Sequence, residues 1–376
     1  MYKKQMNIRK YFFWFHLIIG CSAAIFIFLM SITGVGLTYE KQMIQAAQQA
    51  DFPTIPSENA TRLTLDNVIE MTHSYPIKKS ASISFSNEIN APFVIKEGRK
   101  TLAYLNPFTG DEIATPGQET TVFLSKLRAF HRWLTLDGKF SETGRWVNGI
   151  ANIIFLILAL SGLYLWLPTK FNKRGFKQKL ILTKNHTNTQ ARNYQWHNTF
   201  GFYMAPLLIV ITFTAIFFSF KWPGNTLKSY VSSQTQELPK AEALTPDNIN
   251  QQLSMQTLLS KVSTANPNWQ TISLSVAKAP QSIQTFQVDM GTGGEPKKRK
   301  SVLLNTLNGE LIAEQGFDDN STYRKIRTYI RFLHTGEMYG LVGQTLAGLA
   351  SLLACLLVYT GIAMSLRRWK LSRNNN

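Results

Sequence analysis

Cysteine and charge are both scarce along much of this 376-residue chain. The two cysteines, Cys21 and Cys355, lie within long apolar runs, so we expect neither a disulfide framework nor a cysteine-based metal site. Four stretches contain no Asp, Glu, Lys or Arg, and each is long enough to cross the ~30 Å apolar core of a bilayer as a helix. We therefore predict four membrane-spanning helices, at residues 11–39, 146–169, 193–220 and 338–366.

Acidic residues are missing from three short segments beside these runs: the N-terminal tail, the loop between the second and third runs, and the C-terminal tail. Cytoplasmic segments of membrane proteins carry such an excess of Lys and Arg, so both termini and the loop are expected in the cytoplasm. Because basic segments here also attract anionic lipid, the net charge of +18 indicates the lipid bilayer as partner and not nucleic acid. The basic residues of the three segments are Lys3, Lys4, Arg9, Lys10, Lys170, Lys173, Arg174, Lys177, Lys179, Lys184, Arg192, Arg367, Arg368, Lys370 and Arg373.

The chain is an internal duplication. His16 and His197 lie near the start of the first and third runs, and each is followed by a Gly four residues on and a Thr seventeen residues on. A longer segment then follows, with a helical pattern, three strand-like runs and a turn that reads YLNPFTGDEI in one copy and LLNTLNGELI in the other. An amphipathic stretch with His131 or His334 leads into the next membrane run. Parallel repeats of this kind are related by a two-fold axis along the membrane normal.

The expected fold is an α-helical membrane protein: a four-helix transmembrane bundle built from two parallel repeats, with two small α+β domains on the outer side of the membrane. Strands are expected at 82–86, 92–96 and 101–106, and again at 271–276, 285–290 and 301–305. The expected parts are the cytoplasmic tail and first spanning helix at 1–40, the first outer domain at 41–122, an amphipathic His segment and second spanning helix at 123–169, the basic cytoplasmic loop at 170–192, the third spanning helix at 193–220, the second outer domain at 221–320, and the second amphipathic His segment, fourth spanning helix and cytoplasmic tail at 321–376.

Four of the six histidines occupy matched places in the repeat, and the two-fold axis pairs His16 with His197 on the inner side and His131 with His334 on the outer side. Haem iron in an electron carrier takes two axial ligands, and neutral imidazole is a favoured one. We therefore expect the four histidines to be axial ligands of two haem groups, one near each face of the bilayer. Interfacial hydrogen-bonding residues are one alternative. A zinc site is another, although two imidazoles fall short of its usual three or four protein ligands.

Arginines flank the outer histidine pair. A guanidinium pairs well with a carboxylate, so these residues are expected to contact haem propionates, with ordinary interfacial cations as the alternative. They are Arg128, Arg132, Arg327 and Arg331.

Nucleotide-binding motifs are absent from the sequence. No G-x-G-x-x-G follows a strand on the inner side, and GTGGEPKKRK at 291–300 lacks the phosphate-loop spacing, so it is expected to be a hairpin tip. The electron donor is therefore expected to be a membrane quinol or a separate cytoplasmic protein.

Several motifs together resemble the PepSY-associated transmembrane family of bacterial iron-regulated inner-membrane proteins. They are RKYFFWFHLIIG, LRAFHRWL with SGLYLWLP, QWHNTFGFY, and LHTGEMYG with YTGIAMSLRRW, in this order. The resemblance covers nearly the whole chain. Ala215 departs from the pattern, because the first repeat has Gly34 there.

The resemblance implies a multi-pass protein of the bacterial inner membrane with two PepSY-like periplasmic domains. It implies an oxidoreductase in which two haem b groups pass electrons to a ferric siderophore in the periplasm and release ferrous iron. It also implies the ligand role of His16, His131, His197 and His334. The alternative is a membrane-anchored PepSY binding or inhibitory module without redox activity. The sequence does not identify a catalytic residue.

Overall fold

The chain folds into two compact units in the computed structural model. A bundle unit holds Met1–Glu40, Phe123–Tyr230 and Tyr329–Asn376, and a sheet unit holds Lys41–Val122 and Val231–Thr328. Lys3, Lys4 and Lys170 of the basic segments lie outside the described residues. The described residues are 8–77, 81–98, 100–135, 138, 140–168, 173–231, 238–244, 246–249, 251–277 and 279–374.

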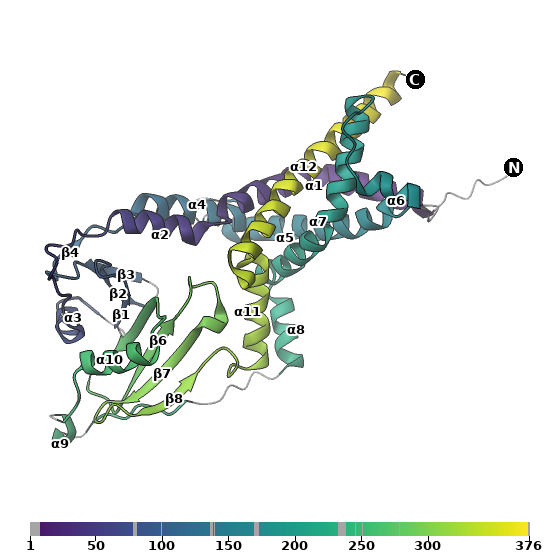
Figure 1. The fold of residues 1–376 in the computed structure, drawn as a ribbon. Helices are drawn as coiled ribbons and strands as arrows, with labels where there is room; N and C mark the ends of the chain where they lie inside the picture. Colours follow the sequence, from purple (N-terminus) through teal and green to yellow (C-terminus); the bar gives the residue numbers. More distant parts are fainter. Residues whose placement is uncertain are drawn as a thin grey trace. The chain divides into compact units, whose positions relative to one another are not determined.

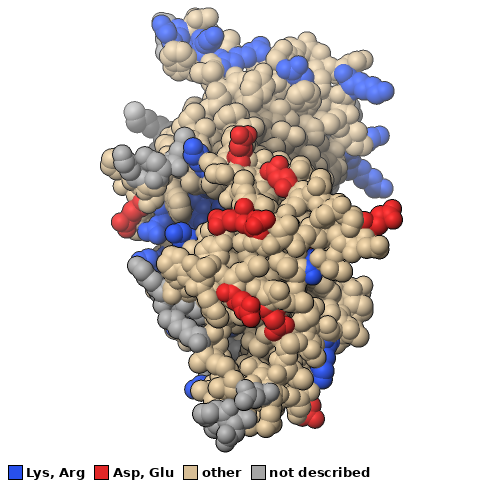
Figure 2. Space-filling model, turned by 90° about the vertical axis from the view of Figure 1, so that its left-hand side faces the viewer, with Lys and Arg blue, Asp and Glu red and all other residues tan. Residues whose placement is uncertain are grey.

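Long apolar helices form the bundle unit, and the prediction of four spans is confirmed. In the described part of the chain, four helical segments are long and apolar enough to cross a membrane. They are α1 (Ile8–Leu37), α5 (Ser141–Trp166), α7 (Thr189–Ser219) and α12 (Gly340–Asn374), the last preceded by the 3-10 helix η2 (Glu337–Tyr339) (Figure 1). Figure 2 shows Lys and Arg without Asp or Glu at the upper end of the view, where the last turns of α12 lie.

The packing of the four helices follows the repeat. Helix α1 packs against both α5 and α12, and α7 packs against the same two helices. A two-fold rotation that exchanges the repeats replaces α1 by α7 and α5 by α12, so it preserves this set of contacts. The first and third spans therefore stand diagonally across the bundle, the arrangement in which residues on their inward faces approach one another.

Helix α5 ends where its sequence and its neighbours require. Pro168 disfavours helical geometry at the residue before it, which ends the helix at Trp166. The last carbonyl groups, which have no partner within the helix, accept bonds from cations. Arg9 Nη2 donates to the Leu165 oxygen at 2.6 Å and to the Leu167 oxygen at 2.7 Å, and Lys179 Nζ donates to the oxygen of Trp166.

Shorter helices connect these spans. Helix α6 lies in the basic loop and packs on α7, where Thr199 Oγ1 donates to the Lys179 oxygen at 3.0 Å and Tyr203 Oη to the Leu180 oxygen at 3.2 Å. The sequence does not indicate α6 or α8, because short helices show little periodicity. The connecting helices are α4 (Gln118–Trp133), α6 (Lys173–Leu180), α8 (Trp222–Tyr230) and α11 (Thr322–Thr335).

One antiparallel sheet dominates the sheet unit. Its strand order is β4-β3-β2-β1-β5-β6-β7-β8, so the four strands from each repeat lie together and the two repeats join between β1 and β5. The register pairs Ile83 with Leu274 and Phe85 with Ile272. The strands are β1 (Ala81–Ser86), β2 (Phe93–Glu97), β3 (Lys100–Leu105), β4 (Glu112–Ile113), β5 (Thr271–Val276), β6 (Ile283–Asp289), β7 (Arg299–Asn305) and β8 (Leu311–Gln315).

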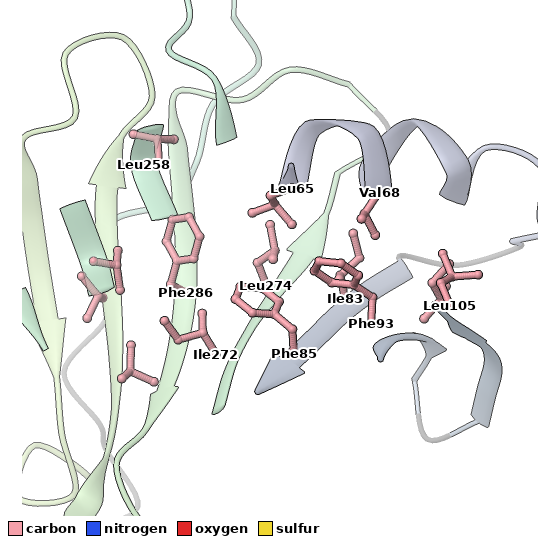
Figure 3. Packing of buried hydrophobic residues seen from close by; sticks show 14 of the residues in the cluster. Leu65, Val68, Ile83, Phe85, Phe93, Leu105, Leu258, Ile272, Leu274 and Phe286 are labelled. Carbon is pink, nitrogen blue, oxygen red and sulfur yellow. The ribbon is translucent and has the colours of Figure 1, made fainter. Parts of the chain in front are cut away.

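A single core runs across both halves of this sheet. Leu65 and Val68 on α3 and Leu258 on α10 cover buried strand residues from both repeats, among them Ile83 and Phe286 (Figure 3). Alternate residues of β1 are buried, as expected for a strand with one face on a core. The remaining helices are α2 (Glu40–Ala50), α3 (Leu65–Thr72), α9 (Pro246–Ile249), α10 (Met255–Ala265) and η1 (Pro296–Lys298).

The expectation of two separate α+β domains is not confirmed, because the two segments share one sheet and one hydrophobic core. The strands expected from the sequence are present, but β4 and β8 were missed because each follows the turn as a short edge strand. The two halves join because β1 and β5 would otherwise be edge strands with unpaired backbone groups. Each strand completes its hydrogen bonds by pairing with the other.

The repeated turn has one geometry in both copies, as predicted. Asn106 Oδ1 accepts from Phe108 N at 2.9 Å, and Gly110 has φ +81°. In the second copy Asn305 Oδ1 accepts from Leu307 N at 2.8 Å. Its glycine, Gly309, has φ +71°, a conformation that favours glycine. The stretch at 291–300 holds most of the connection from β6 to β7 and the first two residues of β7, in agreement with the predicted hairpin tip.

Candidate functional site: paired membrane histidines

Four helices supply the four histidines. His16 lies on α1, His197 on α7, His131 near the end of α4 and His334 near the end of α11. His16 and His197 are close enough for a charge on one to act on the other. Burial, and after it the proximity of His334, lowers the pKa of His131 to about 4. The structure therefore brings together the two pairs expected from the repeat.

The His16–His197 pair is held by hydroxyl groups of the neighbouring helices. His16 Nδ1 lies 2.8 Å from Ser161 Oγ on α5, and His197 Nδ1 lies 2.9 Å from Thr360 Oγ1 on α12. Ser161 and Thr360 occupy equivalent places in the repeat and are 5% and 0% exposed. Each ring thus bonds through Nδ1 to the second spanning helix of its own repeat.

Hydroxyl groups also hold the His131–His334 pair, and here they come from the first spanning helix of each histidine's own repeat. His131 Nδ1 lies 2.8 Å from Thr33 Oγ1 on α1, and His334 Nδ1 lies 3.2 Å from Thr214 Oγ1 on α7. His334 Nδ1 is also 3.0 Å from the carbonyl oxygen of Ile211. All four rings therefore use Nδ1 for hydrogen bonding, which leaves Nε2 as the nitrogen suited to a metal.

Glycines let two of the rings lie against helix backbone. A Cβ added at Gly162 would lie 3.4 Å from His16 Cε1, and one at Gly361 would lie 3.4 Å from His197 Cε1. Both positions recur in the repeat. A larger side chain at either would occupy the space of the imidazole, so each glycine keeps its ring in place.

The expected propionate arginines fall into different settings. Arg128 Nη1 pairs with Glu40 Oε1 at 2.5 Å. Arg132 lies over the Trp133 ring, and burial together with the nearby Arg128 and Arg331 lowers its pKa. Among the described residues neither Arg132 nor Arg331 forms an ion pair.

The fourth arginine, Arg327, belongs to the sheet unit, where its Nη1 donates to Tyr323 Oη at 3.1 Å. The repeat also breaks at the carboxylate that pairs with Arg128. Lys221 stands at the place equivalent to Glu40, so the second repeat lacks that acid. The structure thus brings Arg128, Arg132 and Arg331 together beside the His131–His334 pair and leaves Arg327 with the other unit.

Sequence reasoning missed the roles of the hydroxyl residues. Thr33 and Thr214 were visible as matched positions, and SG at 161–162 matches TG at 360–361, but nothing in the sequence connected them to the histidines. Asn148 gave no signal, because its repeat counterpart is Ala347. Its Nδ2 donates to the His131 oxygen at 2.7 Å and so fixes the end of α4.

The donor set can hold a haem at each pair. Two neutral imidazoles from different helices, each with Nδ1 engaged and Nε2 open, are what axial ligation of a haem iron uses. In the described residues no group of three or more His, Cys, Asp or Glu gathers as a metal site.

Comparison with known proteins gives the family of the chain. No curated protein matches the sequence. A family model described as the PepSY-associated TM region matches residues 13–368, nearly the full length. The match begins within α1 and ends within α12, and it includes α5, α7 and most of each motif that suggested this family. The chain therefore belongs to the family of proteins with a PepSY-associated transmembrane region.

Proposed function

We propose that the protein is a dihaem membrane oxidoreductase that carries electrons across the bacterial inner membrane to a ferric siderophore. The observation that supports this most is the arrangement of His16, His197, His131 and His334 as two pairs with every Nδ1 already bonded. Imidazoles held in this way, with Nε2 left for a metal, suit axial ligation of a haem iron.

A haem b supplies one-electron redox chemistry at its iron when bound. His16 and His197 would hold one group, and His131 and His334 the other. Arg132 and Arg331 are the proposed propionate contacts, because neither has an acidic partner among the described residues. Arg128 is a weaker choice, since Glu40 already neutralises it.

The proposed orientation rests on charge. The basic tails and loop favour the cytoplasm, which puts the His16–His197 pair near the inner face and the His131–His334 pair near the outer face. An electron donor, a quinol or a cytoplasmic protein, would act at the inner pair. The ferric siderophore would be reduced at the outer pair.

Reduction of the ferric ion allows iron to leave a siderophore. Hydroxamate and catecholate oxygens are hard ligands that suit ferric iron better than ferrous iron. One electron added to the iron therefore weakens the complex without breaking the organic chelator. The released product is ferrous iron, and the chelator remains intact.

The test is a haem count on the full-length protein purified after expression with haem supplied. Two haems per chain and a bis-imidazole spectrum are expected. His131→Ala and His334→Ala should each remove the same haem, and His16→Ala and His197→Ala the other. His73→Ala, at the end of α3 in the sheet unit, is the matched control and should retain both.

Activity is measured on the same samples as ferrous iron captured by a chelator after a donor and a ferric siderophore are added. Loss of either haem should abolish it. A colourless wild-type protein would contradict the proposal and leave the alternative, a membrane-anchored binding or inhibitory module. Full function in the variant with all four histidines replaced would do the same.

A further inference from the structure

Each hydroxyl that touches a histidine also bonds to its own helix. Thr33 Oγ1 donates to the Leu29 oxygen at 2.6 Å, Thr214 Oγ1 to the Val210 oxygen at 2.7 Å, and Thr360 Oγ1 to the Leu356 oxygen at 2.9 Å. Ser161 Oγ donates to the Leu158 oxygen at 3.3 Å. All four side chains thus have a carbonyl acceptor on one side and an imidazole on the other.

The direction of these bonds follows from the number of protons. A hydroxyl has one proton, and a carbonyl oxygen only accepts. Both contacts of a hydroxyl are hydrogen bonds at the same time only if its proton goes to the carbonyl and its lone pair faces the imidazole. The imidazole must then donate, so the proton of the neutral ring lies on Nδ1 and the lone pair on Nε2.

We propose that Ser161, Thr360, Thr33 and Thr214 are positioning residues that fix the tautomer and the rotation of the four histidines. They act through the rings: each holds Nδ1–H and thereby aims the Nε2 lone pair. This inference rests on the proposed function, since it gives the four hydroxyls a role in presenting ligands to two haems. The Nδ1–H tautomer that it assigns does not depend on bound haem.

The four positions are not equally dependent on the hydroxyl. His334 Nδ1 keeps the Ile211 oxygen at 3.0 Å if the Thr214 hydroxyl is lost. His16 bonds through Nδ1 to Ser161 alone among the described residues. Removal of the hydroxyl should therefore disturb His16 strongly and His334 weakly.

The experiment compares Ser161→Ala and Thr214→Val in the haem-loaded, full-length protein. The shape of the low-spin ferric electron paramagnetic resonance signal reports the angle between the two axial rings. Ser161→Ala should change the signal of one haem and shift its midpoint potential, and Ser161→Thr should restore both. Thr214→Val should change the other haem's signal by less.

A matched control lies two residues from Thr214. Thr212 is 1% exposed, and its Oγ1 donates to the Leu208 oxygen at 2.7 Å without touching a histidine. Thr212→Val should leave both haem signals unchanged. An unchanged signal in Ser161→Ala, or a change in Thr212→Val as large as that in Thr214→Val, would overturn the inference.

Failure of the proposed function would look different. A wild-type chain without haem contradicts the dihaem assignment, and the tautomers can then be read directly from ¹⁵N shifts of the histidine-labelled chain. Protonated Nδ1 with bare Nε2 at the four paired rings supports the inference. Protonated Nε2 at these rings overturns it.

Discussion

Ser84 of β1 pairs directly with Ser273 of β5, and each is the counterpart of the other in the repeat. The two-fold axis of the sheet unit therefore passes between these two residues. Neither repeat forms a complete sheet by itself, because β1 hydrogen-bonds to β2 of its own repeat on one side and to β5 of the other repeat on the other side. The two segments that flank the second and third spans in sequence should consequently fold as one cooperative unit.

A core substitution in one segment should destabilise both. Phe286 is fully buried in the shared core, so Phe286→Ala should lower the free energy of unfolding of the sheet unit by about 3–5 kcal/mol. Hydrogen exchange measured on the full chain should show lost protection in β1 and β2 as well as in β5 and β6. Leu311→Ala, at a residue 59% exposed on the edge strand β8, is the control and should change little. Lost protection confined to the second segment would contradict the single core.

Helices α3 and α10 of the sheet unit are joined by hydrogen bonds between their N-terminal turns. The carboxylate of Asp66 on α3 accepts from Met255 N at 2.8 Å and Gln256 N at 3.0 Å, two groups that α10 itself leaves unpaired. Asp66→Ala should therefore cost about 1–2 kcal/mol of stability, measured by denaturant unfolding of the sheet unit. Glu58→Ala, at an exposed residue of the same unit, should be neutral. Equal effects of the two variants would show that the carboxylate does not act as a cap.

The glycine beneath His197 should be intolerant of side chains. A Cβ at Gly361 already lies 3.4 Å from the ring, so the branches of valine would displace it. Gly361→Val is expected to lose the haem proposed for the His16–His197 pair and to keep the other, as measured by the pyridine haemochrome count. Gly201→Val, where a Cβ would meet only the flexible end of Leu357 at 3.7 Å, should keep both. Retention of both haems in Gly361→Val would show that the ring does not rest on this backbone.

The arginine cluster should raise one haem potential. A positive charge near the iron favours its reduced, less positive state. Arg132→Gln and Arg331→Gln should therefore each move the midpoint potential of the haem proposed at the His131–His334 pair to a more negative value in a spectroelectrochemical titration. Lys228→Gln, at an exposed residue of α8, removes the same charge and should move neither potential. Equal shifts of both potentials by Arg132→Gln would mean that the cluster has no local effect.

The spacing of apolar, charged and turn residues along the chain predicted most of the helices and strands. The uncharged runs predicted α1, α5, α7 and α12. Alternating apolar residues predicted all strands except β4 and β8. The turn at Asn106 and the turn at Asn305 followed from an asparagine and a glycine at fixed spacing. These features depend on neighbours along the chain, and the repeat supplied each of them twice.

The sequence by itself determined the four spans, the family and the four histidines worth pairing, because hydropathy and internal repetition can be read along one dimension. Only the tertiary structure decided that two outer segments make one sheet and that each imidazole meets a hydroxyl. His16 and Ser161 are 145 positions apart, and His197 and Thr360 are 163 apart. Contacts over such separations depend on which helix faces pack together, and a repeat shows that two positions are equivalent without showing what each one touches.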